Sequence, residues 1–181
     1  MSQHTGSIPV ENLHRWGADA TQRLLGHTIS ISDDQWREPS LLPGWSRAHV
    51  ATHLARNADH LRAVIDAAVA GKEKPAAPPV EQRRAALERG ADRDGLALQI
   101  DLDTSAGALQ ASLDGVTDWT VPVVLHRAPH ELAAVPLARL HEVCVHTIDL
   151  DCHFTADAID PGPAAWLLRW VLDLLVDTDG R

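Results

Sequence analysis

The stretch Arg139-Leu-His-Glu-Val-Cys-Val-His146-Thr-Ile-Asp149 decides the fold and the chemistry that we expect of this chain. It contains no Gly or Pro, and its apolar residues recur on one side of a helix. Glu142 and His146 are four residues apart, so their side chains share one helix face, about 6 Å apart along the axis. A carboxylate and an imidazole on adjacent turns can bind one metal ion. Because a catalytic zinc ordinarily takes three protein ligands, another ligand must come from elsewhere in the chain.

A second predicted helix, residues 47–70, carries a row of histidines that could supply this ligand. His49, His53 and His60 are spaced i, i+4 and i+11, so they lie roughly on one face. A row of this kind is more often a solvated or hydrogen-bonded edge than a metal site. His53 is the best candidate, because it lies among alanine and leucine residues, where a histidine needs a polar partner.

The pattern of the whole chain predicts an all-α fold. We expect an up-down-up-down bundle of four long helices with an extra C-terminal helix and at most a small β-hairpin, and such bundles build metal sites from facing helices. The expected long helices span residues 10–27, 47–70, 98–114 and 136–151, a short charged helix spans 81–90, hairpin strands span 119–125 and 131–135, and the last helix spans 164–176.

Composition limits the classes of function. The 181 residues are 45% hydrophobic, which is enough for one core, so we expect a disordered lead at 1–9 and one domain at 10–181. The net charge of -9 and the lack of a basic stripe disfavour nucleic-acid binding. The sequence has no secretory signal and no apolar run near the ~18 residues of a membrane span. We therefore expect a cytoplasmic protein.

Two stretches resemble motifs of one known family. Leu42-Pro-Gly-Trp-Ser-Arg-Ala-His-Val-Ala-Thr-His53-Leu-Ala-Arg-Asn-Ala-Asp59 resembles the helix-two motif of mycothiol-dependent maleylpyruvate isomerases, which carry a DinB-like four-helix bundle. Arg139-x-x-Glu142-x-x-x-His146-x-x-Asp149-Leu150 resembles their helix-four motif, about ninety residues later and in the family's order. The resemblance covers residues 10–175. It implies that His53, Glu142 and His146 bind a divalent metal, usually zinc, and that the site accepts the low-molecular-weight thiol mycothiol.

The chain departs from the family pattern in two ways. The isomerases usually continue into a smaller C-terminal α/β domain, which we expect residues 10–181 to lack. Position 141 is His, where members often have Arg. If that Arg binds an acidic substrate, this protein prefers a different one.

The resemblance implies a metal- and mycothiol-dependent enzyme that isomerises maleylpyruvate from cis to trans by adding and then eliminating a thiolate. The nucleophile is expected to be a metal-bound thiolate and no protein side chain. Two alternatives stay open: a mycothiol S-transferase acting on another electrophile, and a non-catalytic zinc-binding regulatory module. The expected partners are mycothiol and a small acidic or electrophilic molecule, and the expected oligomeric state is a monomer or homodimer.

Two arginines are predicted to bind substrate. Arg83 and Arg139 suit this role because a guanidinium fork binds a carboxylate bidentately. Arg139 could instead only pair with Glu142, one turn away. Arg83 lies in a charged run, which is more often a solvated face.

Other polar residues near the two motifs are predicted to have supporting roles. Asp149 follows His146 by three residues and is expected to orient its imidazole. Cys144 is two positions from Glu142 and so points away from the ligand face, which predicts a core residue. Cys152 and His153 could add a ligand, although nothing in the pattern requires it.

Overall fold

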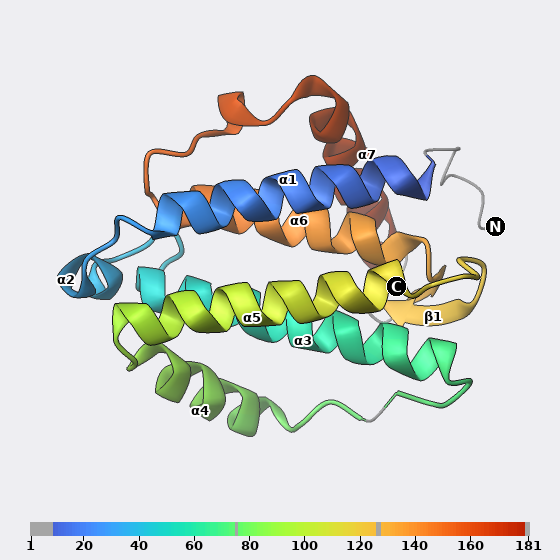
Figure 1. The fold of residues 1–181 in the computed structure, drawn as a ribbon, viewed down its shortest axis with the longest axis horizontal. Coiled ribbons are helices and arrows are strands. Elements are labelled where there is room, and N and C mark those ends of the chain that lie inside the picture. Colours follow the sequence, from blue (N-terminus) through green and yellow to red (C-terminus); the bar gives the residue numbers. More distant parts are fainter. Residues whose placement is uncertain (1–8, 75, 126–127, 180–181) are drawn as a thin grey trace.

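The long helices of this protein form the expected bundle. The computed structural model describes residues 9–74, 76–125 and 128–179, with side chains as far as Leu172, so the predicted disordered lead falls outside it except for Pro9. The four long helices are α1 (Val10–Thr28), α3 (Arg47–Val69), α5 (Gly95–Asp114) and α6 (Ala134–Asp149) (Figure 1). The all-α prediction is thereby confirmed.

The directions of the helices differ from the prediction in one respect. Helix α4 (Val80–Ala91) returns the chain along the outside of the bundle, so α3 and α5 run parallel to each other and antiparallel to α1 and α6 (Figure 1). The hydroxyl of Ser112, near the end of α5, donates to the carboxylate of Asp66, near the end of α3, over 2.8 Å. The predicted up-down-up-down order of helix directions therefore holds only when α4 is counted together with the four long helices.

Smaller elements lie at both ends of the bundle. The short helix α2 (Asp33–Arg37) precedes α3, and the hairpin strands β1 (Pro122–Leu125) and β2 (Ala128–Glu131) pair antiparallel before α6. The second strand begins earlier than predicted, because residues from 134 onward already belong to α6. Among the described residues, none of the helices is long and apolar enough to cross a membrane.

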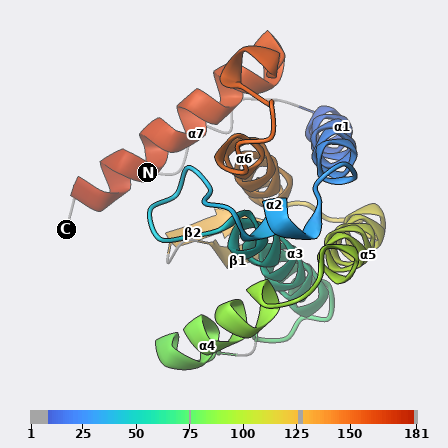
Figure 2. The same ribbon diagram turned by 90° about the vertical axis from the view of Figure 1, so that its left-hand side faces the viewer.

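Helix α7 (Pro161–Asp179) lies outside the four long helices, and a short 3-10 helix, η1 (Ala156–Ala158), precedes it (Figure 2). Helix α7 begins three residues before its predicted start at residue 164. Proline is compatible with the first turn of a helix, where no backbone donor is needed, so the prolines at 161 and 163 do not delay it.

The core has two main parts, one at each end of the bundle. At the hairpin end, residues of α3, α5 and the start of α6 pack together: Leu61, Val64, Ile65, Leu109, Leu113, Val135 and Leu137. At the α2 end the core contains Leu24, Trp36, Val50, Leu54, Leu98, Leu102, Val143 and Leu150. Leu54 and Val143 are fully buried, so the residues beside them on α3 and α6 are held firmly in place.

Gly95, at the start of α5, lies against a buried tryptophan, and we expect it to tolerate no side chain. An added methyl group would lie 2.6 Å from Cδ1 of Trp36, whose ring is 1% exposed and has no room to move. Gly95→Ala should therefore lower the free energy of unfolding by about 1–3 kcal/mol. Gly107→Ala in the same helix, with nothing within 4 Å of the new methyl, should raise it by about 0.5–1 kcal/mol. Urea denaturation of both variants tests this, and equal midpoints would contradict it.

Candidate metal centre

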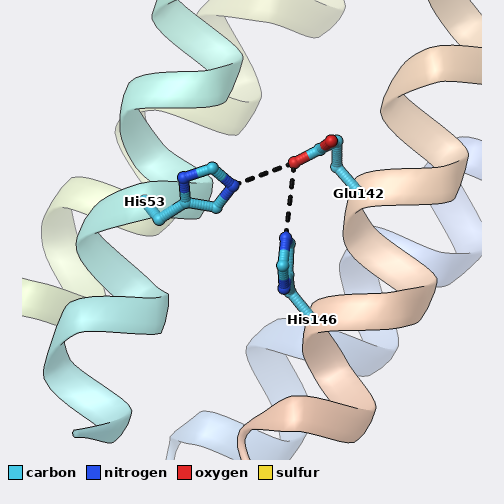
Figure 3. A group of neighbouring side chains, drawn as sticks. All are labelled: His53, Glu142 and His146. Carbon is cyan, nitrogen blue, oxygen red and sulfur yellow. Dashed lines mark hydrogen bonds and ion pairs between the residues drawn. The ribbon is translucent and has the colours of Figure 1, made fainter. Parts of the chain in front are cut away.

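The structure brings together the three side chains that the family resemblance assigns to a metal. His53 comes from α3, whereas Glu142 and His146 come from α6 (Figure 3). Nε2 of His53 lies 3.0 Å from Oε2 of Glu142, and Nε2 of His146 lies 3.5 Å from the same oxygen. One potential ligand atom from each residue lies within 4.8 Å of the others. In the described part of the chain, this is the only group of three or more such residues that could hold a metal ion.

The cluster lies at the edge of the core and is open to solvent on one side. Leu54, next to His53, and Val143, next to Glu142, are fully buried and anchor the two helices. The side chain of His53 is 34% exposed, whereas those of Glu142 and His146 are 13% and 17% exposed. A small molecule from solvent can therefore approach on the His53 side.

Hydrogen bonds within the cluster favour the charged forms of Glu142 and His146. Burial by itself would raise the pKa of Glu142, but hydrogen bonds from His146 and His53 hold that pKa well below its usual range. Burial by itself would lower the pKa of His146, but its hydrogen bonds to Glu142 and Asp149 raise it above its usual value. Glu142 is therefore a carboxylate at neutral pH, with both of its lone-pair-rich oxygens able to act as ligand atoms.

Asp149 lies where it can orient His146, as predicted. Nδ1 of His146 is 2.8 Å from Oδ2 of Asp149 and donates its proton to that carboxylate. In the neutral imidazole this leaves the lone pair on Nε2, which faces Glu142 and His53. Such an acceptor on the far side of a histidine ligand is the usual partner of metal-binding imidazoles.

Neighbouring residues of the predicted histidine row do not join the cluster. Nε2 of His49 lies 3.1 Å from Oε2 of Glu88 on α4, and its Nδ1 lies 2.7 Å from Oγ of Ser46. His60 lies 3.2 Å from Nζ of Lys74. Of the three histidines in this row, His53 is the one that belongs to the clustered potential ligands among the described residues.

Comparison with known proteins agrees with this geometry. A family model for the mycothiol maleylpyruvate isomerase N-terminal domain matches residues 18–151, which include all three clustered side chains. This chain belongs to that family.

Two solved structures of a mycothiol-dependent maleylpyruvate isomerase, one of them a histidine-to-alanine mutant, share the fold of this chain. Each aligns with a TM-score of 0.83 and 23% sequence identity, over 93% of this chain and 70% of that one. A comparison with curated proteins found no match. At this identity, the likeness establishes the DinB-like fold of the family.

Arg139, which was predicted to bind substrate, is buried between two helices. Its side chain is 4% exposed and lies between α6 and α3. Nη1 donates to the carbonyl oxygen of Leu54 over 2.8 Å and to Oδ1 of Asn57 over 2.9 Å. Burial lowers the pKa of Arg139 to about 10, partly opposed by Glu142, so the guanidinium is charged at neutral pH. The structure thus directs the described hydrogen bonds of Arg139 to α3, and its contact with substrate stays a prediction.

Arg83 lies on α4 with an exposed side chain, and its contact with substrate stays a prediction.

The sequence pattern did not indicate a role for Trp45 beside the cluster. The ring of Trp45 lies 5.5 Å from the ring of His53 and 6.3 Å from that of His49, measured between centroids. The sequence could have indicated this position, because Trp45 comes just before the predicted N-cap Ser46. A residue there packs against the first turns of the helix that carries His49 and His53.

The two cysteines lie outside the cluster. Cys144 is 5% exposed and packs with Leu140 and Leu167, between α6 and α7, as its position in the helix predicts. Burial raises the pKa of the Cys144 thiol to about 11. Cys152 is partly buried and its Sγ donates to the carbonyl oxygen of Leu150. Cys152 and His153 are not among the clustered potential ligands.

Proposed function

We propose that this protein is a metal- and mycothiol-dependent enzyme that isomerises maleylpyruvate or a close analogue from cis to trans. The observation that carries the proposal is the convergence of His53, Glu142 and His146 in a member of the mycothiol maleylpyruvate isomerase N-terminal domain family. The cytoplasmic location expected from the sequence, and the choice of zinc as the ion, belong to the same proposal.

The side chains of the cluster fit a divalent ion. Two imidazole nitrogens and one carboxylate oxygen within 4.8 Å of one another form the His2Glu set of many catalytic zinc sites. The partial exposure of His53 leaves room for a further ligand from solvent. When bound, a divalent ion would supply positive charge that favours the thiolate form of a thiol at neutral pH.

The residues of the chain would then position the thiol and the ligands. Asp149 holds the His146 ring in one tautomer through the 2.8 Å hydrogen bond to Nδ1. The ring of Trp45 lies 5.5 Å from that of His53, between centroids, and would place an apolar surface beside the bound thiol. Arg83, exposed on α4, is the proposed partner of a substrate carboxylate.

The reaction itself needs only a thiolate and a conjugated cis double bond. The sulfur forms a bond to one alkene carbon, and the electron pair of the double bond moves onto the conjugated carbonyl. The remaining single bond rotates. When the carbon–sulfur bond breaks, the double bond re-forms in the trans geometry and the thiolate is regenerated. Thiol is therefore a catalyst in this reaction and is not consumed.

One departure from the family favours a second candidate, a mycothiol S-transferase. His141 stands where members often have Arg, and its Nδ1 lies 4.0 Å from Oε1 of Glu142. A substrate with fewer carboxylates would suit this environment better. If that substrate had no conjugated double bond, the elimination step that releases the thiolate would not follow. The sulfur of mycothiol would then stay bound to the substrate carbon.

The balance of thiol distinguishes the candidates. Metal-loaded protein is mixed with maleylpyruvate and a tenfold smaller amount of mycothiol, and both the trans product and the free thiol are measured. An isomerase should convert all of the substrate while the free thiol stays constant. In the same assay with a model electrophile in place of maleylpyruvate, a transferase should stop when the thiol is consumed, with one adduct per thiol. No conversion of maleylpyruvate or of model electrophiles would contradict both and favour a non-catalytic module.

A further inference from the structure

Two arginines cross between α3 and α6, one on either side of the candidate metal centre. Arg139 extends from α6 to α3, where Nη1 donates to the carbonyl oxygen of Leu54, the residue that follows His53. Arg47 extends the opposite way, from the first turn of α3 to the C-terminal end of α6. The two contacts are therefore reciprocal, because each helix contributes one arginine that reaches the other.

The contacts of Arg47 join three segments. Nε donates to the carbonyl oxygen of Leu150 over 2.7 Å, and Nη2 donates to that of Asp151 over 3.2 Å. Nη1 donates to the carboxylate of Glu38 and to the carbonyl oxygen of Gln35, 3.1 Å away. The Arg47 side chain is 12% exposed, and its hydrogen bond to Leu150 is partly buried, whereas those to Gln35, Glu38 and Asp151 lie at the surface. A cation at the end of α6 also interacts favourably with the helix dipole.

The order of contacts along the two antiparallel helices places the cluster between the arginines. Moving along α6, Arg139 meets Leu54 and Asn57, Glu142 then meets His53, and Leu150 meets Arg47. Each arginine has more than one acceptor, and a planar guanidinium with two acceptors fixes orientation as well as distance.

The metal ligands depend on this alignment, because they come from two separate helices. Glu142 and His146 are held relative to each other by the backbone of α6, whereas the position of His53 relative to them depends on how α3 packs in the bundle. A slip of α3 by a single residue moves His53 by about 1.5 Å. Metal–ligand distances tolerate about 0.2 Å, so such a slip would remove His53 from the site.

We infer that Arg139 and Arg47 are positioning residues that fix the spacing and register of α3 and α6 and thereby preorganise the metal centre. This inference rests on the proposed function, since it assumes that the cluster binds a metal. It gives Arg139 a role that explains its burial, and it gives Arg47 a role that no sequence motif indicated.

The test compares metal binding in Arg139→Met, Arg47→Met and a matched control, Arg56→Met. Arg56 is also on α3, but its guanidinium pairs with Asp101 of α5 and not with α6, and its side chain is 50% exposed. Each variant is titrated with cobalt(II), and its visible absorption spectrum and urea midpoint are recorded. We expect both positioning variants to bind cobalt about 10- to 100-fold more weakly, with shifted absorption bands, under conditions where they are folded. Arg56→Met should keep the wild-type affinity and spectrum.

Arg139→Lys and Arg47→Lys guard against variants that do not fold. Lysine keeps the charge but loses the planar fork, so its variants should also show weakened cobalt binding and altered bands. Wild-type affinity and spectrum in the folded Arg139 and Arg47 variants would overturn the inference, even if their urea midpoints fell, because a merely stabilising role predicts that result. Failure of the wild-type protein to bind cobalt would instead overturn the metal site of the proposed function.

Discussion

Glu142→Gln is expected to lower the affinity of the protein for zinc or cobalt by at least about 100-fold, or about 3 kcal/mol. Glu142 is the anionic member of the cluster, and its Oε2 lies within 3.0 Å of His53 Nε2 and 3.5 Å of His146 Nε2. Glutamine keeps the size and shape of the side chain but removes the charge that offsets the cost of placing a divalent ion in a half-buried site. His53→Ala and His146→Ala should each remove one ligand and give losses of similar size.

Equilibrium titration with a competing chelator measures this affinity. Glu88→Gln is the matched control, because Glu88 also contacts a histidine, His49, but lies 59% exposed on α4 outside the cluster. Glu88→Gln should bind metal as the wild type does. Equal metal stoichiometry and affinity in the wild type, Glu142→Gln and His146→Ala would place the metal site elsewhere.

The affinity should also depend on pH with a definite sign. Hydrogen bonds to Glu142 and Asp149 raise the pKa of His146, so this ring keeps its proton to a higher pH than an ordinary histidine. A metal ion must displace that proton. Affinity should therefore fall as the pH is lowered through the raised pKa of His146, and Asp149→Asn should move this fall to lower pH.

Turnover without mycothiol is expected to drop to the uncatalysed rate, whereas Cys144→Ser should retain most of the activity that mycothiol supports. Cys144 is 5% exposed between α6 and α7, and burial raises its pKa to about 11. At neutral pH only about one thiol in ten thousand would be ionised at that pKa. Cys152 is also made less acidic, chiefly by burial. Neither cysteine is suited to act as the nucleophile, which is why we expect the thiolate of the proposed reaction to come from solution.

The measurement uses metal-loaded protein freed of small thiols by gel filtration, with maleylpyruvate as substrate. Mycothiol is then added back in steps, and the initial rate should rise from background to saturation. The same titration is made with Cys144→Ser, and the urea midpoint of this variant is measured separately. A loss of packing would lower the midpoint, whereas a chemical role of the thiol would lower the rate. Undiminished turnover before any thiol is added would refute the mechanism and favour attack by a water molecule.

The helical segments of this protein could be predicted because their signals are local. Apolar spacing, the Gly and Pro breaks and the N-cap Ser46 act within a few residues of the backbone they control, and the observed bounds of α1, α3 and α6 lie within two residues of the predicted ones. The shared face of Glu142 and His146 follows from helix geometry alone. The apolar setting of His53 made it the best candidate for a further ligand, and the family resemblance implied its pairing with Glu142, since no local rule relates residues 89 positions apart.

The roles of the arginines and the path of the chain were decided by tertiary structure. Sequence alone determined that Arg139 lies one turn before Glu142, but whether its guanidinium meets substrate or another helix depends on what packs against α6. The carbonyl of Leu54 and the amide of Asn57 fill that position. Likewise, α4 carries a charged helical pattern, yet only its packing outside α3 makes α3 and α5 parallel. Local forces thus determine where helices begin and end, whereas burial of side chains between helices determines which residues meet.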